Sequence, residues 1–515
     1  MKILMCSSEA VPFAKTGGLA DAVSSLSLAL AEAGHDVKIV IPRYYSINKS
    51  ELTLLEGSLG VPMGEGIEEW CGVFKTKMPG SNTKNPVWVY FIDHEIFFGR
   101  SGIYGDHFHP DFIDNPRRFS FFSRSIFQLC HKLAWYPDIL HSHDWPTAPV
   151  CAYLKFSLRT GHFEKTSSIL TIHNLGYQGS YHKDNFNYTG LGWNVFYDGG
   201  FEDWGGMNML KAGIYCADRL NTVSQTYCDE TKTQESGFRL DGPLRYRSAD
   251  YRGILNGIDE KVWSPKTDKL IPKNYSAEDL SGKAQSKAAL QAEFGLPVDP
   301  KVPVIGMISR LVEQKGVGSL FGPTYGSAYS FCRDMALQFV VLGTGEAWCE
   351  NEILALSSRL PNFKARVGYS EKLSHLIEAG SDFFLMPSAY EPCGLNQMYS
   401  LVYGTLPIVR RTGGLADTVQ NYSQETGDGT GFMFDYLSPG SIYDTVGWAN
   451  WTYYNKPKDI EKMRRRGLQM DFSWTNSAKK YVDMYQNALG VDSNIKKTPV
   501  HEHPKSADKK TKPKA

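Results

Sequence analysis

The sequence has no excess of either charge, because its 55 Lys and Arg residues balance its 55 Asp and Glu residues. A chain without net charge gives no electrostatic indication of a nucleic-acid or anionic membrane partner. No uninterrupted apolar stretch approaches the ~20 residues that a membrane-spanning helix needs. These absences argue against nucleic-acid and membrane partners.

Paired cysteines are also missing. The nine Cys residues are scattered along the chain and form no Cys-x-x-Cys pair. An odd, scattered set is typical of reduced intracellular proteins, and it indicates neither a disulfide framework nor a zinc site. The apolar start Met1–Cys6 predicts a strand rather than a secretory signal, since Ser7-Ser8-Glu9 interrupts it too early. We therefore expect a cytoplasmic protein.

The length of 515 residues suggests two or three domains, and strands alternate with helices along the chain. Strand Lys2–Cys6, a helix through Leu30 and strand Val37–Ile41 form a βαβ unit, which is typical of an open parallel sheet. The polar segment Ser264–Asn274 indicates an interdomain linker. We expect an N-terminal domain at 1–263, a C-terminal domain at 264–472, a final amphipathic helix at 473–489 and a disordered basic tail at 490–515.

One short phrase occurs near both ends of the chain. Residues 15–23 and 411–419 share a basic residue, a Thr, the word GGLAD and a final Val. Each copy follows a short strand and opens a helix. The repeat therefore predicts two related Rossmann-like α/β domains.

The second copy lies in residues 383–419, the stretch that contains the most candidate ligand-binding features. A buried strand ends there in a turn that carries Glu391, and Gly394 opens the next helix. A further strand delivers Arg410 and Arg411 to the second GGLAD copy. Free backbone N–H groups at helix N-termini suit hydroxyls or phosphates. We expect the carboxylate, the two helix N-termini and the basic pair to converge at the carboxyl edge of a parallel sheet.

Other candidates follow predicted strands. His173 comes directly after strand Ser168–Ile172 and before a glycine-containing loop, which suits either a cleft residue or a structural histidine. Arg310 and Lys315 follow strand Val302–Ile308 and precede a glycine. Two cations at one strand end indicate an anion site, although exposed Arg and Lys are often only solvated charges.

The run His141-Ser142-His143-Asp144-Trp145 has a spacing that could suggest a metal site. No further His or carboxylate pair lies nearby at ligand spacing. We therefore interpret these side chains as hydrogen-bonding groups in a cleft. The glycine turn Gly343-Thr344-Gly345 by itself is weak evidence of nucleotide binding.

Six motifs taken together resemble bacterial glycogen synthases and plant starch synthases. They are KTGGL at 15–19, HNL with YQG at 173–179, LNG at 255–257, SRL with QKG at 309–316, EPCGL at 391–395 and RTGGL at 411–415. The motifs stand in the right order, and the resemblance extends over almost the whole chain up to Leu489. This combination is far more specific than any single glycine loop.

The resemblance implies a retaining glucosyltransferase whose two Rossmann-like domains face each other across a deep cleft (GT-B), with a C-terminal helix that crosses back to the first domain. Such an enzyme moves glucose from ADP-glucose to the non-reducing 4-hydroxyl of an α-1,4-glucan such as glycogen, with the acceptor on the first domain and the donor on the second. It uses no cofactor or metal, which agrees with the absence of any Asp-x-Asp motif. A UDP-glucose-dependent relative and a catalytically silent glucan-binding protein remain alternatives, and the oligomeric state stays open.

The same resemblance assigns the site residues. The implied catalytic residues are His173, Arg310, Lys315 and Glu391. Donor binding is implied for Lys15, Gly17, Gly18, Asp21, Asp144, Asn256, Tyr369, Cys393, Gly394 and Leu395. Arg310 and Lys315 stabilise the leaving phosphate, Glu391 accepts hydrogen bonds from glucose hydroxyls, and Tyr369 stacks on adenine. No metal ligand is implied.

Two features depart from related proteins. Tyr399 stands eight positions after Glu391, where many related retaining transferases carry a second glutamate. Tyrosine at this place is familiar in glycogen and starch synthases, and the resemblance implies a front-face displacement with the leaving phosphate as base rather than a two-carboxylate mechanism. The segment 318–332 is also less helical in pattern than the family leads us to expect.

Overall fold

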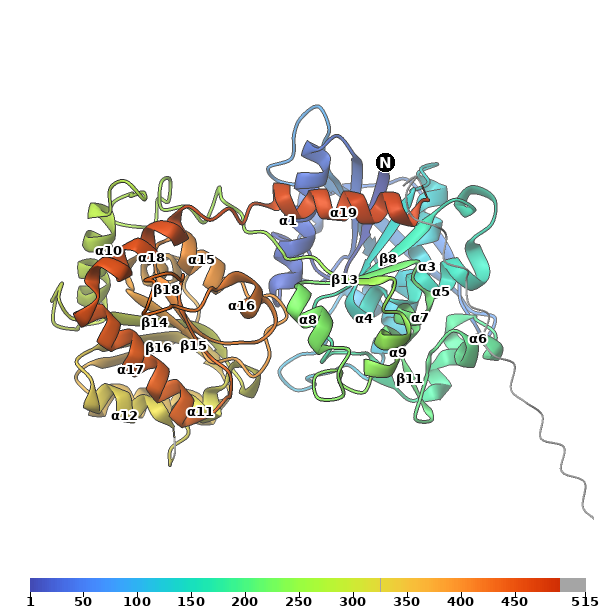
Figure 1. Cartoon of the computed structure of the whole chain (residues 1–515). Helices are drawn as coiled ribbons and strands as arrows, with labels where there is room; N and C mark the ends of the chain where they lie inside the picture. Colours follow the sequence, from blue (N-terminus) through green and yellow to red (C-terminus); the bar gives the residue numbers. More distant parts are fainter. Residues whose placement is uncertain (325, 491–515) are drawn as a thin grey trace, which may run out of the picture.

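The computed structural model describes residues 1–324 and 326–490, so most of the tail expected at 490–515 lies outside the described residues. The chain forms two α/β lobes that lie side by side (Figure 1). Each lobe is built on its own largely parallel sheet. Within the described ranges, no helix combines the length and apolar character needed to cross a membrane.

The first domain contains a sheet of seven parallel strands with an antiparallel edge. The parallel strands are β1 (Lys2–Cys6), β2 (Asp36–Pro42), β6 (Trp88–Asp93), β7 (Ile139–His143), β8 (Ser167–Ile172), β12 (Arg219–Thr222) and β13 (Tyr251–Gly253). They lie in the order β13-β12-β8-β7-β1-β2-β6. The unpredicted edge consists of β3 (Thr53–Leu54), β4 (Leu59–Pro62) and β5 (Glu68–Lys77). The order reverses between β1 and β7, and ligands of such sheets bind at this point.

Helices cover the first sheet, and a small sheet extends it. The helices are α1 (Gly18–Glu32), α2 (Glu95–Phe98), α3 (Asn115–Lys132), α4 (Asp144–Thr147), α5 (Pro149–Tyr153), α6 (Trp193–Asp198), α7 (Met209–Cys216), α8 (Gln225–Glu230) and α9 (Asp241–Tyr246); the small sheet contains β9 (Ser180–Tyr181), β10 (Glu202–Asp203) and β11 (Gly206–Asn208). Central strands read as apolar runs because both faces are covered, and every residue of β8 is buried.

The second domain contains six parallel strands in the order β16-β15-β14-β17-β18-β19. They are β14 (Val304–Leu311), β15 (Gln338–Gly345), β16 (Phe363–Val367), β17 (Phe383–Met386), β18 (Leu406–Arg410) and β19 (Phe432–Phe434). The helices are α10 (Ser281–Glu293), α11 (Val317–Phe321), α12 (Ser327–Asp334), α13 (Ala347–Arg359), α14 (Glu371–Gly380), α15 (Asn396–Val402), α16 (Gly413–Thr418), α17 (Pro439–Asn455) and α18 (Pro457–Leu468). The strand order reverses between β14 and β17, which defines a second binding edge.

Strand β14 is longer than its apolar run predicts. The sequence pattern ends the strand at Ile308, whereas the structure continues it through Leu311 and pairs Arg310 with Thr344 of β15. The extra pairing fixes the backbone of Arg310 on the sheet rather than in the following turn. The side chain of this arginine is therefore presented from a rigid element.

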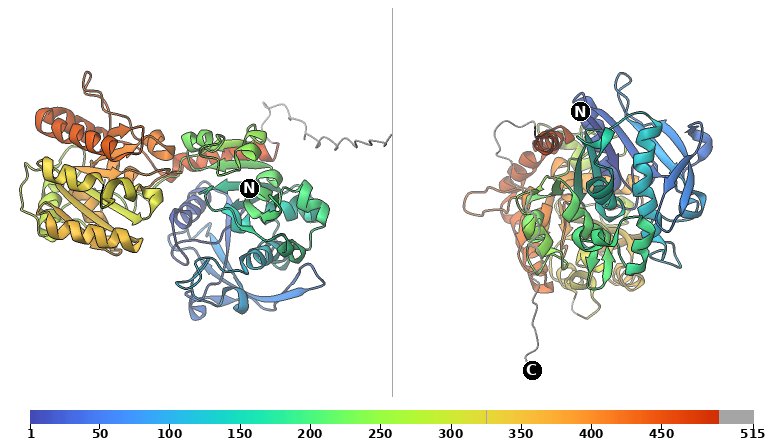
Figure 2. Two further views of the ribbon diagram at one scale, coloured as in Figure 1. Left: turned by 90° about the horizontal axis from the view of Figure 1, so that it is seen from below. Right: turned by 90° about the vertical axis from the view of Figure 1, so that its right-hand side faces the viewer.

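The last helix, α19 (Trp474–Ala488), lies against the first domain (Figures 1 and 2). Its Tyr481 and Tyr485 are buried in the first-domain core. The chain crosses between the domains twice, and the two crossings meet where the backbone N–H of Ile258 donates to the carbonyl of Phe472 at 2.9 Å. A Cβ on the neighbouring Gly257 would lie 2.7 Å from the backbone nitrogen of Trp474, so only glycine fits this joint.

The segment 264–274, expected to be a linker, is fastened to the second domain. The carboxylate of Asp268 lies 2.8 Å from Nδ1 of His375 and accepts a hydrogen bond from the hydroxyl of Tyr403 at 2.6 Å. All three side chains are buried, so these bonds are shielded from water. The joint between the domains is therefore the crossing at Ile258 and Phe472 rather than the segment 264–274.

An aromatic stack holds the residue that precedes this segment. The indole of Trp263 lies between the rings of His375 and Tyr399, with centroids 3.9 and 4.0 Å away. Tyr399 is the residue at which the resemblance led us to compare the chain with transferases that carry a second glutamate. In this chain that position packs against an indole and supplies no carboxylate.

Helices α8 and α16 face each other across the domain boundary and cap each other. The backbone N–H of Thr226 in α8 donates to the carboxylate of Asp417 at 3.0 Å, and that of Gly413 in α16 donates to the carboxylate of Glu230 at 3.1 Å. Carboxylates at helix N-termini satisfy unpaired N–H groups and interact favourably with the helix dipole. The expectation that the N-terminus of α16 faces the cleft is therefore wrong, because the carboxylate of Glu230 occupies this N-terminus.

The basic pair before α16 also turns away from the cleft, contrary to expectation. Arg411 forms an ion pair with Asp435 at 2.7 Å. Arg410 donates to the backbone carbonyls of Ala389 and Asp435. Both cations therefore fix loops of the second domain and do not join the carboxylate of Glu391 at the ligand edge.

We expect Glu230→Ala to lower the free energy of unfolding by about 1 kcal/mol, because it removes the cap of α16. Urea denaturation measures this loss. Glu235→Ala is the matched control, since Glu235 is exposed on the loop after α8. A denaturation midpoint of Glu230→Ala equal to that of the control would show that the cross-domain cap contributes nothing.

Candidate active site

The structure places all fourteen site residues expected from the sequence on the wall of one cleft between the domains, with a volume of about 1560 Å³. The cleft lies at the carboxyl ends of β1, β7 and β8 on one side and of β14 and β17 on the other. These are the positions where both sheets reverse their strand order. The fold therefore brings these residues together on one surface.

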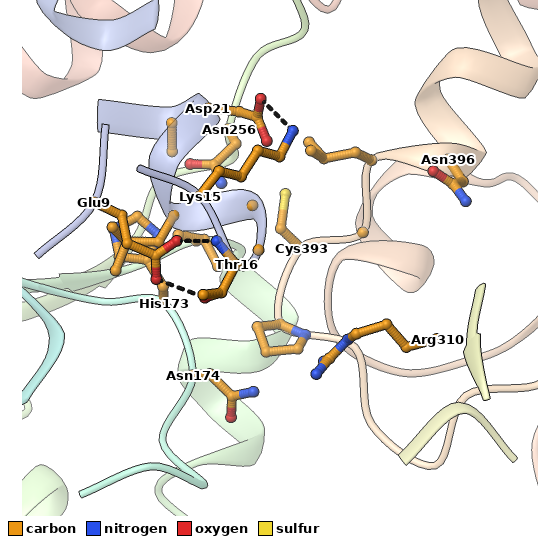
Figure 3. A pocket seen from close by; sticks show the side chains of 18 of the residues that line it. Glu9, Lys15, Thr16, Asp21, His173, Asn174, Asn256, Arg310, Cys393 and Asn396 are labelled. Atoms are coloured by element: carbon orange, nitrogen blue, oxygen red, sulfur yellow. Dashed lines mark hydrogen bonds and ion pairs between the residues drawn. The ribbon is translucent and has the colours of Figure 1, made fainter. Parts of the chain in front are cut away.

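The first GGLAD copy forms part of the first-domain wall (Figure 3). Lys15 forms an ion pair with Asp21 at 2.8 Å, and both side chains remain partly open to solvent. Gly17 borders open space, since a Cβ there would meet no heavy atom within 4 Å. A Cβ on Gly18 would lie 3.7 Å from Leu395 of the second domain. The glycine loop therefore leaves room for a ligand and also contacts the opposite wall.

A buried acid, Glu9, organises the same loop and was missed from the sequence. Its carboxylate accepts hydrogen bonds from the hydroxyl of Thr16 at 2.7 Å and from the backbone N–H of Thr16 (Figure 3). It also accepts one from the hydroxyl of Tyr104 at 2.6 Å. Three donors compensate the burial of a carboxylate that is 2% exposed. The signal available in the sequence was an acid directly beyond the first strand, on the binding edge.

Asp144 begins α4 and holds the loop after β8. Its backbone has a left-handed φ of 56°, and its Oδ1 accepts the backbone N–H groups of His173 at 2.7 Å and of Asn174 at 3.3 Å. Burial raises the pKa of Asp144 to about 7, against the opposing effect of these two donors. Asp144 thus acts on the cleft by placing the backbone of His173.

The side chain of His173 is held from behind by His143, whose Nδ1 lies 3.0 Å from Nε2 of His173. Burial lowers the pKa of His173 to about 3, so the imidazole is neutral at physiological pH. The run around Asp144 therefore supplies hydrogen bonds, as interpreted from the sequence. Residues 1–324 and 326–490 contain no group of three or more side chains placed to hold a metal ion.

The second-domain wall carries a compact charge cluster. Lys315 donates to the carboxylate of Glu391 at 2.5 Å, and the hydroxyl of Ser388 donates to the same oxygen at 2.9 Å. Arg310 makes one side-chain hydrogen bond within the described part of the chain, to Gln314 at 3.4 Å. Its guanidinium is therefore available to an anionic ligand, whereas Lys315 shares its charge with Glu391.

The turn after Glu391 brings backbone close to the cleft. Gly394 has a left-handed φ of 70°, which a residue with a Cβ adopts only under strain. The side chain of Asn396 donates to the carbonyl of Ile308 at 2.8 Å and fixes the start of α15 to β14. Burial raises the pKa of Cys393 to about 12, so its thiol remains protonated and is not a nucleophile.

Two further residues offer contacts to a ligand. The ring of Tyr369 is 80% exposed at the edge of the cleft, which leaves one face free to stack on a planar group. Asn256 is buried, and no described residue donates a hydrogen bond to its Oδ1. An unpartnered buried acceptor beside a cleft suits a ligand hydroxyl.

Comparison with known proteins agrees with this architecture. Residues 2–246 match the family model of the starch synthase catalytic domain, and residues 291–448 match that of glycosyl transferases group 1. The chain is 56% identical to a glycogen synthase of Treponema denticola over 489 residues, which cover 95% of this chain and 99% of the relative. It is 45% identical to glycogen synthase 1 of Geobacter metallireducens, with 95% and 96% covered.

Among solved structures, the catalytic domain of starch synthase IV from Arabidopsis thaliana, bound to ADP and acarbose, superimposes with a TM-score of 0.84. The two sequences are 30% identical, and the match covers 95% of this chain and 99% of the other. The likeness confirms two Rossmann-like domains in the GT-B arrangement. Because the chain is 56% identical to a named glycogen synthase over almost the full length of both, it belongs to the glycogen synthase and starch synthase family of glycosyltransferases.

Proposed function

We propose that this protein transfers glucose from ADP-glucose to the non-reducing 4-hydroxyl of an α-1,4-glucan, with retention of configuration. The observation that carries the proposal is a pair of cations, Arg310 near the end of β14 and Lys315 in the turn after it, which line one cleft with Lys15 of the first domain. Membership of the family supports a glucan acceptor. ADP is the nucleotide in the similar Arabidopsis structure, which supports the choice of donor.

We further propose that the two domains divide the substrates. The first domain, residues 1–263, takes the acceptor, and the second, residues 264–472, takes the nucleotide sugar. The helix at 473–489 belongs with the first domain. The exposed ring of Tyr369 lies on the donor side and suits stacking on adenine.

Departure of ADP places negative charge on a phosphate oxygen. Fixed cations stabilise such charge most strongly where water is excluded. Arg310 is available for this role, and Lys315 serves it by moving its hydrogen bond from Glu391 to the phosphate. The loss of that ion pair leaves the carboxylate of Glu391 facing the sugar, where it favours positive charge developing at the anomeric carbon.

The reaction then needs no second carboxylate. A two-carboxylate retaining mechanism requires a pair about 5 Å apart, and the second position here is the stacked Tyr399. We propose a displacement on the front face of the sugar. The bond from the anomeric carbon to the phosphate oxygen breaks, the bond to the acceptor oxygen forms, and the acceptor proton passes to the departing phosphate.

Comparison of two donors tests the proposed specificity. We expect kcat/KM for ADP-glucose to exceed that for UDP-glucose by at least about tenfold, because base recognition alone distinguishes the two. Equal or reversed values would contradict the assignment to ADP-glucose. Glucan binding without turnover of either donor would instead favour a catalytically silent binding protein.

We also expect the cleft to close on its substrates, since Lys15, Asp21 and His173 belong to the first domain while Arg310, Lys315 and Glu391 belong to the second. Closure excludes water that would hydrolyse the donor. Small-angle scattering should show a smaller radius of gyration with ADP and maltohexaose than without them. The double variant Arg310→Ala, Lys315→Ala is the control and should not respond. An unchanged radius in the wild-type protein would contradict closure.

A further inference from the structure

A row of three histidines leads from the C-terminal helix to the wall of the cleft. His173 lines the cleft, and its Nε2 lies 3.0 Å from Nδ1 of the buried His143. The ring of His143 packs on that of His141, with centroids 4.2 Å apart. Nδ1 of His141 lies 2.8 Å from the hydroxyl of Tyr485 in α19. A segment remote in sequence is thereby connected to the site.

The proton of His141 can be placed from its neighbours. The side-chain nitrogen of Asn221 donates to the hydroxyl of Tyr481 at 3.1 Å, so its oxygen is free to accept the hydroxyl proton of Thr171 at 2.7 Å. A hydroxyl has one proton, and Thr171 must therefore accept from Nε2 of His141 at 2.6 Å. His141 is thus neutral with its proton on Nε2, and it offers no proton to His143.

His143 also carries a single proton, because burial lowers its pKa well below the ordinary value. Its Nε2 is buried and has no hydrogen-bond partner among residues 1–324 and 326–490. Among buried backbone groups, orphaned N–H donors are rarer than under-satisfied acceptors, and we apply the same preference to the ring. The proton therefore belongs on Nδ1, where Nε2 of His173 accepts it.

We propose that His143 is a positioning residue that fixes the tautomer of His173. By donating its Nδ1 proton to Nε2 of His173, it places the single proton of His173 on Nδ1. The tautomer of a neutral imidazole is set by the hydrogen bond that its other nitrogen makes. Within the described chain nothing else bonds to Nδ1 of His173, so this N–H is the group left for a ligand.

A neutral N–H in the cleft suits an oxygen acceptor, and a hydroxyl of the bound sugar is the acceptor that the proposed function supplies. The effect of His143 on catalysis rests on that proposed function. The tautomer itself does not, because it follows from contacts within the protein.

Nuclear magnetic resonance of protein labelled with ¹⁵N-histidine tests the tautomer directly. In neutral imidazole the protonated and unprotonated ring nitrogens give well-separated signals, and a His173→Gln variant assigns those of His173. We expect a protonated Nδ1 and an unprotonated Nε2 on His173 in the wild-type protein. A proton on Nε2 of His173 would overturn the proposal without any variant of His143.

Variants of His143 test the consequence. His143→Phe removes the donor and should give His173 a mixture of tautomers, with kcat lowered by about 10²-fold and donor KM changed by less than about threefold. In His143→Asn the side-chain N–H takes the place of Nδ1 and should restore the tautomer, with kcat within about tenfold of wild type. Tyr485→Phe is the control and should leave both readouts unchanged.

The outcomes separate the two proposals. A single, unchanged tautomer of His173 in His143→Phe overturns the positioning role, and so does a folded His143→Asn protein as impaired as His143→Phe. Wild-type kcat in a folded His173→Ala protein would instead remove His173 from the proposed function. The assignment of the tautomer would survive that result.

Discussion

Lys315→Ala is expected to lower kcat by about 10²-fold or more, as removal of a preorganised group that stabilises developing charge does in other enzymes. The lysine ends the short turn that follows β14 and forms a 2.5 Å ion pair with Glu391. Its removal leaves the carboxylate with Ser388 as its remaining donor in the described chain. Steady-state kinetics with ADP-glucose measure the loss, and circular dichroism checks the fold.

Arg310→Ala should cause a loss of similar size, because the guanidinium has one weak protein partner and is otherwise free to bind phosphate. Lys301→Ala is the matched control, since Lys301 is an exposed lysine just before β14. Wild-type kcat in a folded Lys315→Ala protein would show that the ion pair with Glu391 is structural and that Lys315 does not act on the leaving group.

Glu391→Gln is expected to lower kcat strongly while changing donor affinity only modestly. The substitution keeps the size and hydrogen-bonding capacity of the side chain and removes the charge that favours a cationic transition state. Binding of ADP-glucose, measured by calorimetry, separates affinity from turnover. Ser388→Ala is the control variant, because it removes a donor to Glu391 and keeps the charge.

Two results would limit Glu391 to a different role. If donor affinity in Glu391→Gln fell as much as kcat while turnover of the bound complex stayed normal, Glu391 would be a binding residue. If Lys315→Ala and Glu391→Gln together were no worse than either change alone, the two side chains would act as one unit.

The sequence predicted those parts of the site that are carried by strand ends. His173 and Glu391 follow buried apolar strands and Arg310 lies near the end of one, and parallel strands bring their carboxyl ends to one edge. The repeat of GGLAD predicted two related domains, and the structure contains two sheets with the same reversal of strand order. Motif order then led to the family, which the comparisons confirm.

The rest depended on contacts that local patterns do not encode. The second GGLAD copy resembles the first, yet Glu230 from the other domain caps it and keeps it out of the cleft. Glu9 is held against the glycine loop because Thr16 and Tyr104 donate to it, and Tyr104 lies 95 residues away. The hydrogen bond between His143 and His173 likewise joins the end of β7 to the loop after β8, and neither segment alone predicts it.

The antiparallel edge of the first sheet and the packing of the segment 264–274 could also not be predicted from the sequence. Strands β3 to β5 were missed because they pair antiparallel at an edge and are partly exposed, so that their apolar runs are short. The segment 264–274 has a linker-like composition, but Asp268 fastens it to His375 and Tyr403. Composition alone cannot reveal such bonds.

The most direct test of the account is transfer from ADP-glucose to maltoheptaose, with the product followed by proton nuclear magnetic resonance. We predict that ADP is released, that the acceptor grows by one glucose, and that the new anomeric proton is that of an α-1,4 linkage. A β-linked product would contradict retention. Release of ADP with free glucose and no longer glucan would show that the cleft hydrolyses its donor instead of transferring the sugar.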